Sequence, residues 1–354
     1  MRMLGTVSLR KQSASLSVDK RTGEKASILI IALWSVSFLA AFAIIISYGV
    51  RQKAMVVQRL EDRDRLHLIA DAGIKYAISE LKKEEDKGYD SLGDGWSNNA
   101  GLFSDRKVGE GSFTISYNYL NPVSAEQEIR YGLIDEERKI NINKASVAVL
   151  KRFFQIVLGF NEMAAQELAA STVDWRDKDS SLSIPLGSAE DSYYRNTRCS
   201  YEAKDEEFEV LEELLLVKGM NQDIFNKIKD YVTIYGSGQV NINTTSEEVL
   251  LSLGLNEKAV YQILRYRYGK DEVPGTPDDN IFNSASNIVP RLSQSFSLSA
   301  SEAAHINEIS NMGLTTSSSN FLIRCVSSID EKNISTMTEC VVDKTGKMLY
   351  WHEV

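Results

Sequence analysis

The stretch Ser27–Val50 decides the fold: it reads SILIIALWSVSFLAAFAIIISYGV and contains no charged side chain. At 1.5 Å per residue, a helix of this length covers about 36 Å, more than the roughly 30 Å hydrocarbon core of a bilayer. A cleaved secretory signal usually has a shorter apolar core, and no small-x-small site followed by a polar mature start is evident. The sequence therefore predicts a helix that spans a membrane.

The charges on the two sides of this segment differ in sign. The 354 residues hold 40 basic and 49 acidic side chains, a net charge of −9. Residues 1–26 hold six basic and two acidic side chains, so the rest of the chain carries the acidic excess. Because positive residues are retained in the cytoplasm, we expect the N-terminus inside and everything after about Val50 outside. The acidic balance also counts against a nucleic-acid partner.

The helix is predicted to continue beyond the membrane. No proline follows Arg51 for many residues, and the first glycine is Gly73. An apolar stripe recurs at three-to-four spacing on one face, through Leu66, Ile69, Ala70, Ile74, Ala77 and Leu81. We expect one helix over residues 27–83, whose second half packs on a domain outside the membrane.

Strand-like segments lie on both sides of a long helical region. They are 111–120 and 129–137 before it, and 321–330, 334–343 and 347–354 after it. The intervening part, 139–312, has helical periodicity. The predicted fold class is α+β, with a long N-terminal transmembrane helix, a small antiparallel β-sheet from 111–138 and 321–354, and a large inserted α-helical domain at 139–312.

The insert contains a repeat. Lys139–Leu150 reads KININKASVAVL and Gln239–Leu250 reads QVNINTTSEEVL. Each copy predicts a short extended segment before a helix, with the asparagines satisfying backbone groups and Thr245 with Glu248 forming a capping box. Between the copies, two helices joined at Lys218-Gly219-Met220 suggest a helix-hairpin-helix-like unit. Such units often bind DNA, but the acidic side chains around this one would repel phosphates.

The ordered segments KININ, STVDWRDKD, GSAEDSYY, FEVLEELLLVKGM and DYVTIYGSGQVNINT resemble the K-type minor pseudopilins of the type II secretion system. The resemblance implies a pilin-type helix, an inner-membrane location with the bulk in the periplasm, and a place at the tip of the pseudopilus. It implies the minor pseudopilins I and J, other pseudopilus and inner-membrane secretion components, and a prepilin peptidase as partners. The implied role is to help initiate pseudopilus assembly and the export of folded proteins.

The same resemblance implies that a basic leader, 1–26, is removed and that the new N-terminus is methylated. We favour a cut between Ala26 and Ser27. A cut after Gly23 is the alternative, but it would leave Glu24 and Lys25 at the head of a helix in lipid. With the favoured cut, the mature fifth position is Ile31, where most pseudopilins carry a glutamate and the K subunit does not.

Acidic side chains form the one candidate ligand site. They are Asp174, Asp177, Asp179, Glu190 and Asp191. Carboxylates converging from loops suit Ca²⁺, and the resemblance also implies calcium as a cofactor. A solvated acidic loop is the alternative. A metal-dependent hydrolase is a rival reading, as is a membrane-anchored DNA-uptake protein. The three histidines lie far from these residues in sequence and no nucleophile motif is present, so we expect no enzyme.

Cys325 and Cys340 fall in the last predicted hairpin. If Lys332 and Asn333 form a two-residue turn, the two cysteines lie opposite each other, and a disulfide is possible in an oxidising periplasm. Two buried free thiols are the alternative, and Cys199 is left unpaired in either case.

Overall fold

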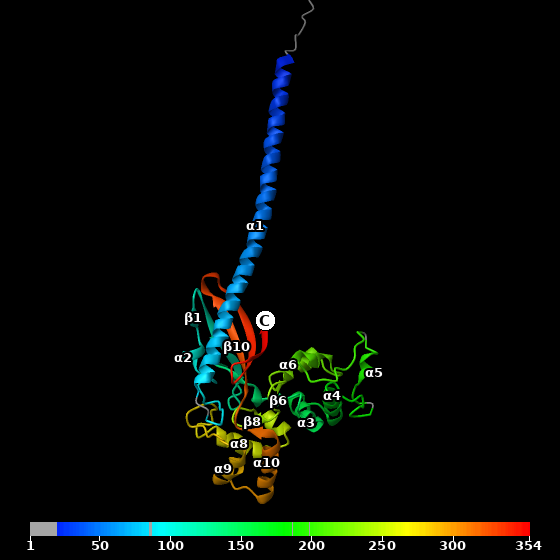
Figure 1. Cartoon of the computed structure of the whole chain (residues 1–354), viewed down its shortest axis with the longest axis vertical. Helices are drawn as coiled ribbons and strands as arrows, with labels where there is room; N and C mark the ends of the chain where they lie inside the picture. Colours follow the sequence, from blue (N-terminus) through cyan, green and yellow to red (C-terminus); the bar gives the residue numbers. More distant parts are fainter. Residues whose placement is uncertain (1–19, 85–86, 186, 198) are drawn as a thin grey trace, which may run out of the picture. The chain divides into compact units, whose positions relative to one another are not determined.

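The computed structural model describes residues 20–84, 87–185, 187–197 and 199–354, and only the backbone within 20–26. The chain divides into two compact units, 1–64 and 65–354. Figure 1 gives the positions of the elements along the chain. Residues 1–19 of the predicted leader and the side chain of Ala26 lie outside the described residues.

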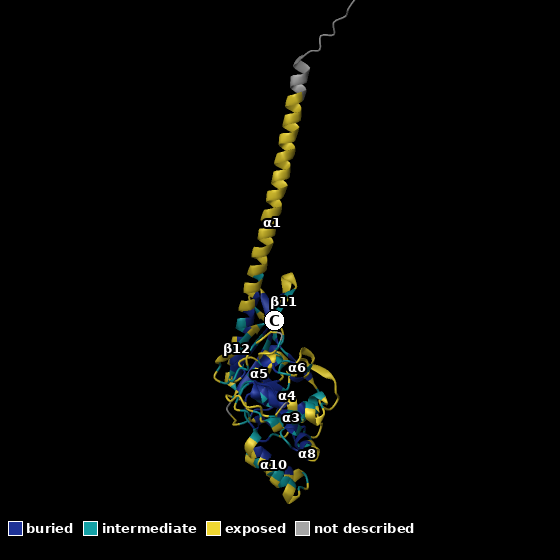
Figure 2. Ribbon diagram, turned by 90° about the vertical axis from the view of Figure 1, so that its right-hand side faces the viewer, coloured by how far each residue is buried: buried dark blue, intermediate teal, exposed yellow. Residues whose placement is uncertain are grey.

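Helix α1 runs from Lys20 to Lys83 and confirms a single long N-terminal helix. It begins seven residues before the predicted start at Ser27, because no proline interrupts the sequence between them. In the first unit, the apolar side chains after Ser27 are exposed, as Figure 2 shows. This is the one described helix that is long and apolar enough to cross a membrane. Exposed apolar side chains around a whole helix suit a lipid surrounding.

In the second unit, strands from both ends of the chain form one antiparallel sheet of order β1-β2-β10-β11-β12, in which β5 also pairs with β10. The strands are β1 Arg106–Val108, β2 Gly111–Ile115, β5 Ile134–Asp135, β10 Asn320–Ile329, β11 Ile334–Asp343 and β12 Met348–Glu353. A 3₁₀ turn, η4 (Asp330–Lys332), joins β10 to β11. The helical domain is therefore inserted between strands of one sheet.

The last turns of α1 cover this sheet with the predicted apolar stripe, and Ala70, Ile74 and Ala77 are fully buried. Gly73 allows the close approach. A Cβ atom there would lie 2.8 Å from Sγ of Cys325 and 2.9 Å from the ring of Phe113. The strand residues and the helix residues thus share one apolar core.

The structure corrects two local predictions around the sheet. The segment 111–120 is broken at Ser116, because β3 (Tyr117–Leu120) leaves the sheet to form a separate hairpin with β4 (Gln127–Arg130). The segment 129–137 ends in a 3₁₀ turn, η1 (Glu136–Arg138). A short helix, α2 (Ala100–Phe103), precedes β1, and the Asn99 side chain caps it.

Of the two alternatives for Cys325 and Cys340, the structure has the free thiols and not the disulfide. The loop that joins β10 to β11 is longer than two residues and ends with Asn333 in the left-handed region. This shifts the register, so Cys325 lies opposite Thr338, and Cys340 lies opposite Ile323. Both thiols are free and buried, and burial raises the pKa of each to about 12. Cys199 is free and exposed.

The inserted part is helical, with its own apolar core. In Figure 1, helices α3 to α6 group in one lobe and α8 to α10 in another. The elements are α3 Val147–Leu158, α4 Glu162–Asp174, α5 Asp191–Tyr194, η2 Leu211–Leu216, α6 Gln222–Ile228, α7 Glu247–Ser252, α8 Glu257–Arg267, η3 Ala285–Asn287, α9 Ile288–Ser295 and α10 Ala300–Gly313.

The sequence repeat is also a structural repeat. In the first copy, β6 (Ile140–Asn141) pairs in parallel with β7 (Val232–Thr233) and leads into α3. In the second copy, β8 (Val240–Asn241) pairs in parallel with β9 (Leu314–Thr315) and leads into α7. We call residues 139–150 the first N-I-N unit and residues 239–250 the second N-I-N unit.

The asparagines of both units bond to the backbone, as predicted. Asn143 exchanges two hydrogen bonds with the backbone of Phe208: Nδ2 donates to its carbonyl (2.9 Å) and Oδ1 accepts from its N–H (2.8 Å). Asn243 makes the same pair of bonds with Phe282, at 2.8 and 2.9 Å. The predicted capping box at Thr245 is wrong. The N-cap of α7 is Ser246, and the Thr245 hydroxyl donates instead to the carbonyl of Arg138.

Candidate metal centre

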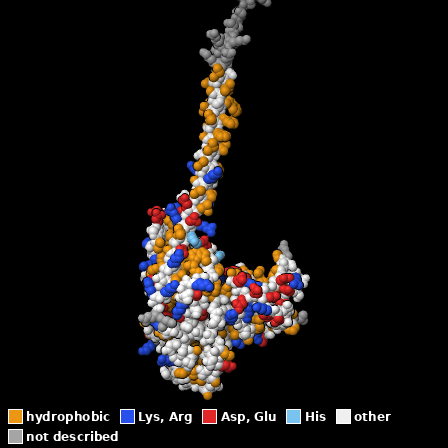
Figure 3. All heavy atoms as spheres, viewed as in Figure 1, with side chains coloured by type: hydrophobic (Ala, Val, Ile, Leu, Met, Phe, Trp, Pro, Cys, Tyr) orange, Lys and Arg blue, Asp and Glu red, His pale blue; other side chains and the backbone are white. Residues whose placement is uncertain are grey.

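The predicted acidic residues come from three segments of the first lobe. Asp174 ends α4 and is fully buried, and both of its carboxylate oxygens accept from the N–H of Ser183 (3.1 and 3.3 Å). Asp177 and Asp179 follow in the next turn, where Asp179 accepts from the N–H of Ser181. Glu190, at the start of α5, is 4% exposed. These four carboxylates lie on a lobe where Figure 3 shows acidic side chains gathered.

A fifth carboxylate belongs to this group and was missed in the sequence analysis. Asp205 adopts a left-handed backbone conformation (φ 54°), and its N–H donates to the carbonyl of Trp175, directly after α4. We call Asp174, Asp177, Asp179, Glu190 and Asp205 the acidic cluster. The only sequence signal was the run of acidic residues that begins at Asp205, which suggested a repulsive surface and not a ligand.

Asp191 was predicted to be a ligand, but its carboxylate is already engaged. One oxygen accepts from Arg195 (2.8 Å), and the other accepts from the N–H of Ala203 (2.9 Å). These two bonds satisfy the carboxylate and tie α5 to the following segment. We therefore place Asp191 outside the acidic cluster.

The electrostatics of the acidic cluster are unfavourable. Burial, followed by the negative charges of Asp174 and Asp179, raises the pKa of Asp177 to about 6. Burial, followed by Asp174 and Asp177, raises the pKa of Glu190 to about 7. Burial also raises the pKa of Asp205. A cation among these groups would reverse this repulsion, since an opposite charge favours the ionised carboxylate.

Three oxygens of the cluster are buried without a hydrogen-bond partner. They are Oδ1 of Asp177, Oε1 of Glu190 and Oδ1 of Asp205. A buried carboxylate oxygen without a donor is costly, and hard cations such as Ca²⁺ prefer oxygen ligands of this type. The side chains as they stand do not form a closed site: no three potential ligands among the described residues converge closely enough to hold an ion. The donor chemistry fits calcium, although the converged geometry is lacking.

Aromatic packing and one lysine hold the loops around the cluster. The Trp175 and Tyr194 rings meet edge to face at 5.1 Å, and Tyr194 stacks on Tyr201 at 5.2 Å. The Nζ of Lys218 donates to the carbonyls of Gly187 and Ser188 (3.0 and 3.3 Å). The cluster therefore rests on an apolar base that includes a tryptophan next to Asp174.

The hairpin at Lys218-Gly219-Met220 differs from the prediction in its first arm, which is the 3₁₀ helix η2 and not an α-helix. Gly219 has φ 85°, and the Asn221 side chain caps α6. The same pattern, a glycine with positive φ followed two residues later by a capping asparagine, joins α3 to α4 and α7 to α8. The sequence signals LGFN, KGMN and LGLN carry this pattern, which the sequence analysis did not use.

The three histidines are engaged away from the acidic cluster. Nδ1 of His67 lies 2.5 Å from the Glu353 carboxylate, and Nε2 of His305 lies 3.0 Å from the carbonyl of Gly254. His352 lies in β12 beside Tyr350. The rival hydrolase reading would require a histidine or another base at the cluster, and these contacts provide none from the histidines.

A long apolar N-terminal helix whose last turns pack on an antiparallel sheet, with a helical domain inserted between strands, defines a pilin-like protein. The family described as "Type II secretion system (T2SS), protein K" matches residues 120–237. A search of curated proteins finds no significant match.

Among solved structures, the chain is similar to one in "The Crystal Structure of the GspK-GspI-GspJ complex from enterotoxigenic Escherichia coli Type 2 Secretion System". The identity is 17% and the TM-score is 0.59, over 86% of this chain and 99% of that chain. At this identity the likeness concerns the fold, and the family match adds the sequence relationship. Residues 120–237 are therefore similar in sequence to protein K of the type II secretion system, and the chain shares the fold of the solved chain.

Proposed function

We propose that this protein is the tip subunit of a type II secretion pseudopilus, where it joins minor pseudopilins I and J, helps initiate assembly and supports the export of folded proteins. The observation that carries the proposal is the protein K match over residues 120–237, which include the first part of the inserted domain. The related solved chain comes from a crystal structure of a GspK-GspI-GspJ complex. In this reading the protein is a structural component and not an enzyme.

Two features support the tip position. Ile31 stands where a pseudopilin that needs a subunit above it would carry a glutamate, because a carboxylate in lipid requires a partner. The inserted domain would also hinder the stacking of further subunits on top. The orientation follows from the basic leader, which would keep the N-terminus in the cytoplasm and the second unit in the periplasm.

Copurification tests the partners. The full chain, expressed with the I and J subunits of the same system and extracted in detergent, should elute with both. Elution of the chain alone, when I and J still associate with each other, would contradict the proposal.

A DNA-cellulose column at low salt serves as the test of the rival DNA-uptake role, and we expect no retention because the second unit is acidic.

Mass spectrometry of the mature N-terminus tests the processing. Expression with a prepilin peptidase should yield a chain that begins with N-methylated Ser27. A chain that begins at Glu24 would move the cut to Gly23, and an intact leader on functional protein would contradict pseudopilin processing altogether.

We also propose that the acidic cluster binds calcium. Asp177, Glu190 and Asp205 would hold the ion through their unpaired oxygens, with Asp174 and Asp179 beside them. The ion would neutralise the cluster and link the turn after α4, the start of α5 and the 205 segment. Without the ion, these residues repel one another at neutral pH.

A pair of neutralising substitutions separates calcium binding from a solvated loop. The full chain in detergent at pH 7.5 should unfold at a higher temperature with calcium than with EGTA. The double variant Asp177→Asn and Glu190→Gln should be more stable than wild type in EGTA and should lose the response to calcium. Glu110→Gln, at an exposed surface pair with Arg65, is the matched control. An unchanged unfolding temperature in every sample would favour the solvated loop.

A further inference from the structure

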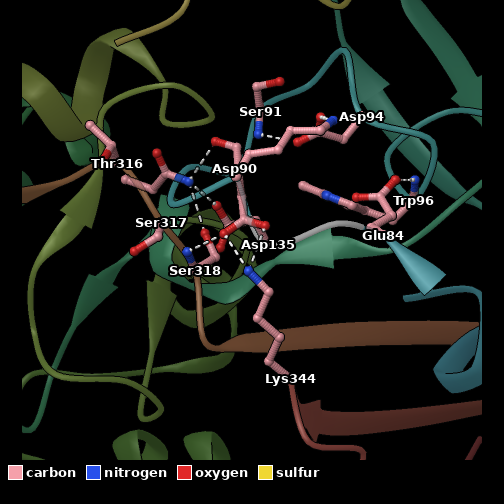
Figure 4. A network of polar contacts seen from close by, with 12 residues as sticks. Glu84, Asp90, Ser91, Asp94, Trp96, Asp135, Thr316, Ser317, Ser318 and Lys344 are labelled. Carbon is pink, nitrogen blue, oxygen red and sulfur yellow. Dashed lines mark hydrogen bonds and ion pairs between the residues drawn. The ribbon is translucent and has the colours of Figure 1, made fainter. Parts of the chain in front are cut away.

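Two short segments connect the sheet to the inserted domain. The outgoing crossing is residues 135–139, the returning crossing is residues 316–320, and both contact a buried polar cluster. We call Asp90, Asp135, Glu137, Asn241, Asn320 and Lys344 the junction cluster. Figure 4 shows Asp90, Asp135 and Lys344 approaching one another beside Ser318. None of these residues takes part in the proposed calcium site.

Asp135 holds the outgoing crossing. Its Oδ1 accepts from the N–H of Glu137 (2.8 Å), and its Oδ2 accepts from Nδ2 of Asn241 (3.1 Å) and from the Thr244 hydroxyl. Asn241 and Thr244 belong to the second N-I-N unit, so this carboxylate attaches the sheet directly to the repeat.

Asp90 and Glu137 hold the returning crossing. The N–H of Asp90 donates to the carbonyl of Thr316 (2.8 Å), and its Oδ2 accepts from the N–H of Ser318 (2.7 Å). The two carboxylate oxygens of Glu137 accept from the N–H and the side-chain Nδ2 of Asn320 (3.0 and 2.8 Å). Two backbone N–H groups of this short segment therefore depend on carboxylates as acceptors.

The junction cluster has too few cations for its carboxylates. Asp90, Asp135 and Glu137 are 4%, 1% and 5% exposed. Among the described residues, Lys344 alone forms an ion pair with one of them, at 3.1 Å from Asp90. The neighbouring Glu136 is already paired with Lys139, and the β7–β8 connection contributes the phenol of Tyr235. Asn320 of β10 and Asn241 of β8 are neutral.

We propose that Glu137 controls the attachment of the inserted domain to the sheet through its protonation state. When Glu137 is protonated, the inserted domain is held firmly against the sheet, and when Glu137 is ionised, residues 316–320 loosen. The proposal does not depend on the calcium site or on the proposed partners. It predicts that the attachment of the inserted domain responds to pH in the compartment outside the membrane.

Two observations support this assignment. Burial, followed by the negative charge of Asp135, raises the pKa of Glu137 to about 7, so its protonation changes near neutral pH. The neutral form also keeps its bonds. The side-chain amide of Asn320 can rotate so that its Oδ1 and Nδ2 exchange places. One oxygen of Glu137 then still accepts from the backbone N–H of Asn320, and the protonated oxygen donates to Oδ1 of Asn320. Protonation removes the charge without removing a contact.

Glu137→Gln reproduces the protonated form, since a glutamine can make the same two bonds with a turned Asn320 amide. We would measure hydrogen exchange of the peptide covering 316–320, using the full chain in detergent at pH 5.5 and pH 8. Comparing variants at one pH cancels the intrinsic pH dependence of exchange. Glu110→Gln again serves as the surface control, because it removes an exposed carboxylate.

At pH 8 this segment should exchange about tenfold more slowly in Glu137→Gln than in wild type, and at pH 5.5 the two should be equal. Equal exchange at both pH values would overturn the proposal. Faster exchange in Glu137→Gln at both pH values would also overturn it, because Glu137 would then be a structural acceptor only. Asp135→Asn should loosen the segment at both pH values, since it places an amide against the donating Nδ2 of Asn241.

Discussion

The two N-I-N units share one hydrogen-bonding arrangement, called here the frame, in which the inner asparagine bonds to a phenylalanine backbone. Their surroundings differ. In both, the inner asparagine (Asn143 or Asn243) exchanges two hydrogen bonds with the backbone of a buried phenylalanine. The outer asparagines differ. Asn141 donates to the carbonyls of Tyr235 and Gly236, whereas Asn241 donates to the Asp90 carbonyl, the Asp135 carboxylate and Ser318. Identical residues thus build the frame, and the neighbours determine which unit meets the junction.

The largest expected effect tests the shared frame. Asn143→Ala and Asn243→Ala each leave a buried phenylalanine N–H and carbonyl without partners, which should lower the free energy of unfolding by about 2–4 kcal/mol. Denaturant unfolding of the full chain in detergent measures both losses, with the exposed Asn118→Ala as the control. A large loss in one unit and none in the other would break the equivalence of the two frames.

The outer asparagines should distinguish the units. Asn241→Ala removes a donor to a buried carboxylate, so we expect a loss of about 2–3 kcal/mol, against about 1–2 kcal/mol for Asn141→Ala, which removes bonds to neutral carbonyls. The same denaturant measurement applies. Equal losses of unfolding free energy would mean that the bond to the Asp135 carboxylate contributes no more than the bonds of Asn141 to neutral carbonyls.

The glycines that follow α3 and α7 give a smaller difference. Gly159 has φ 67° with open space around its Cβ position, and alanine there should cost about 1 kcal/mol. Gly254 has φ 105°, outside the usual left-handed region, and a Cβ would lie 3.3 Å from the guanidinium of Arg152. Gly254→Ala should therefore cost about 1–2 kcal/mol, and a smaller loss than for Gly159→Ala would contradict this comparison.

The smallest expected effect is the pH dependence, and it has two sources. The raised pKa values of Asp177, Glu190 and Glu137 mean that the folded chain binds more protons than the unfolded chain. Stability should therefore fall as pH rises from about 5 through about 7, by a few degrees in unfolding temperature in EGTA.

Calcium and Glu137→Gln should remove different parts of the loss of stability that accompanies rising pH. If calcium binds the acidic cluster, it would compensate the charges beside the first N-I-N unit, whereas Glu137→Gln removes the contribution of the junction cluster beside the second unit. Thermal unfolding across this pH range, with and without calcium, measures both. A profile that calcium alone makes flat would contradict a separate source at the junction.

Local patterns predicted much of this fold. The apolar stripe placed the end of α1 at Lys83, the alternation of residues gave β11 as 334–343, and strand-like segments on both sides of a helical region indicated the insertion. The split between β2 and β3 was missed because both halves alternate in the same way, and only tertiary pairing separates them.

The sites were harder to predict, because they depend on long-range contacts. The cysteine register changed when the hairpin loop lengthened by two residues. Asp205 is distant in sequence from Asp174, and a bond between its N–H and the Trp175 carbonyl holds it near the acidic cluster. The junction cluster draws on residues from 90 to 344, and no sequence spacing could have indicated it.

The three thiols differ in accessibility, which allows selective labelling of one of them. Cys325 and Cys340 are buried, with pKa values raised to about 12, while Cys199 is exposed between α5 and Asp205. Thiolates react with maleimides and thiols do not, so a fluorophore should attach to the unmutated chain at Cys199. Such a dye would sit on the segment that links α5 to Asp205, and it could be followed in membranes as well as in detergent.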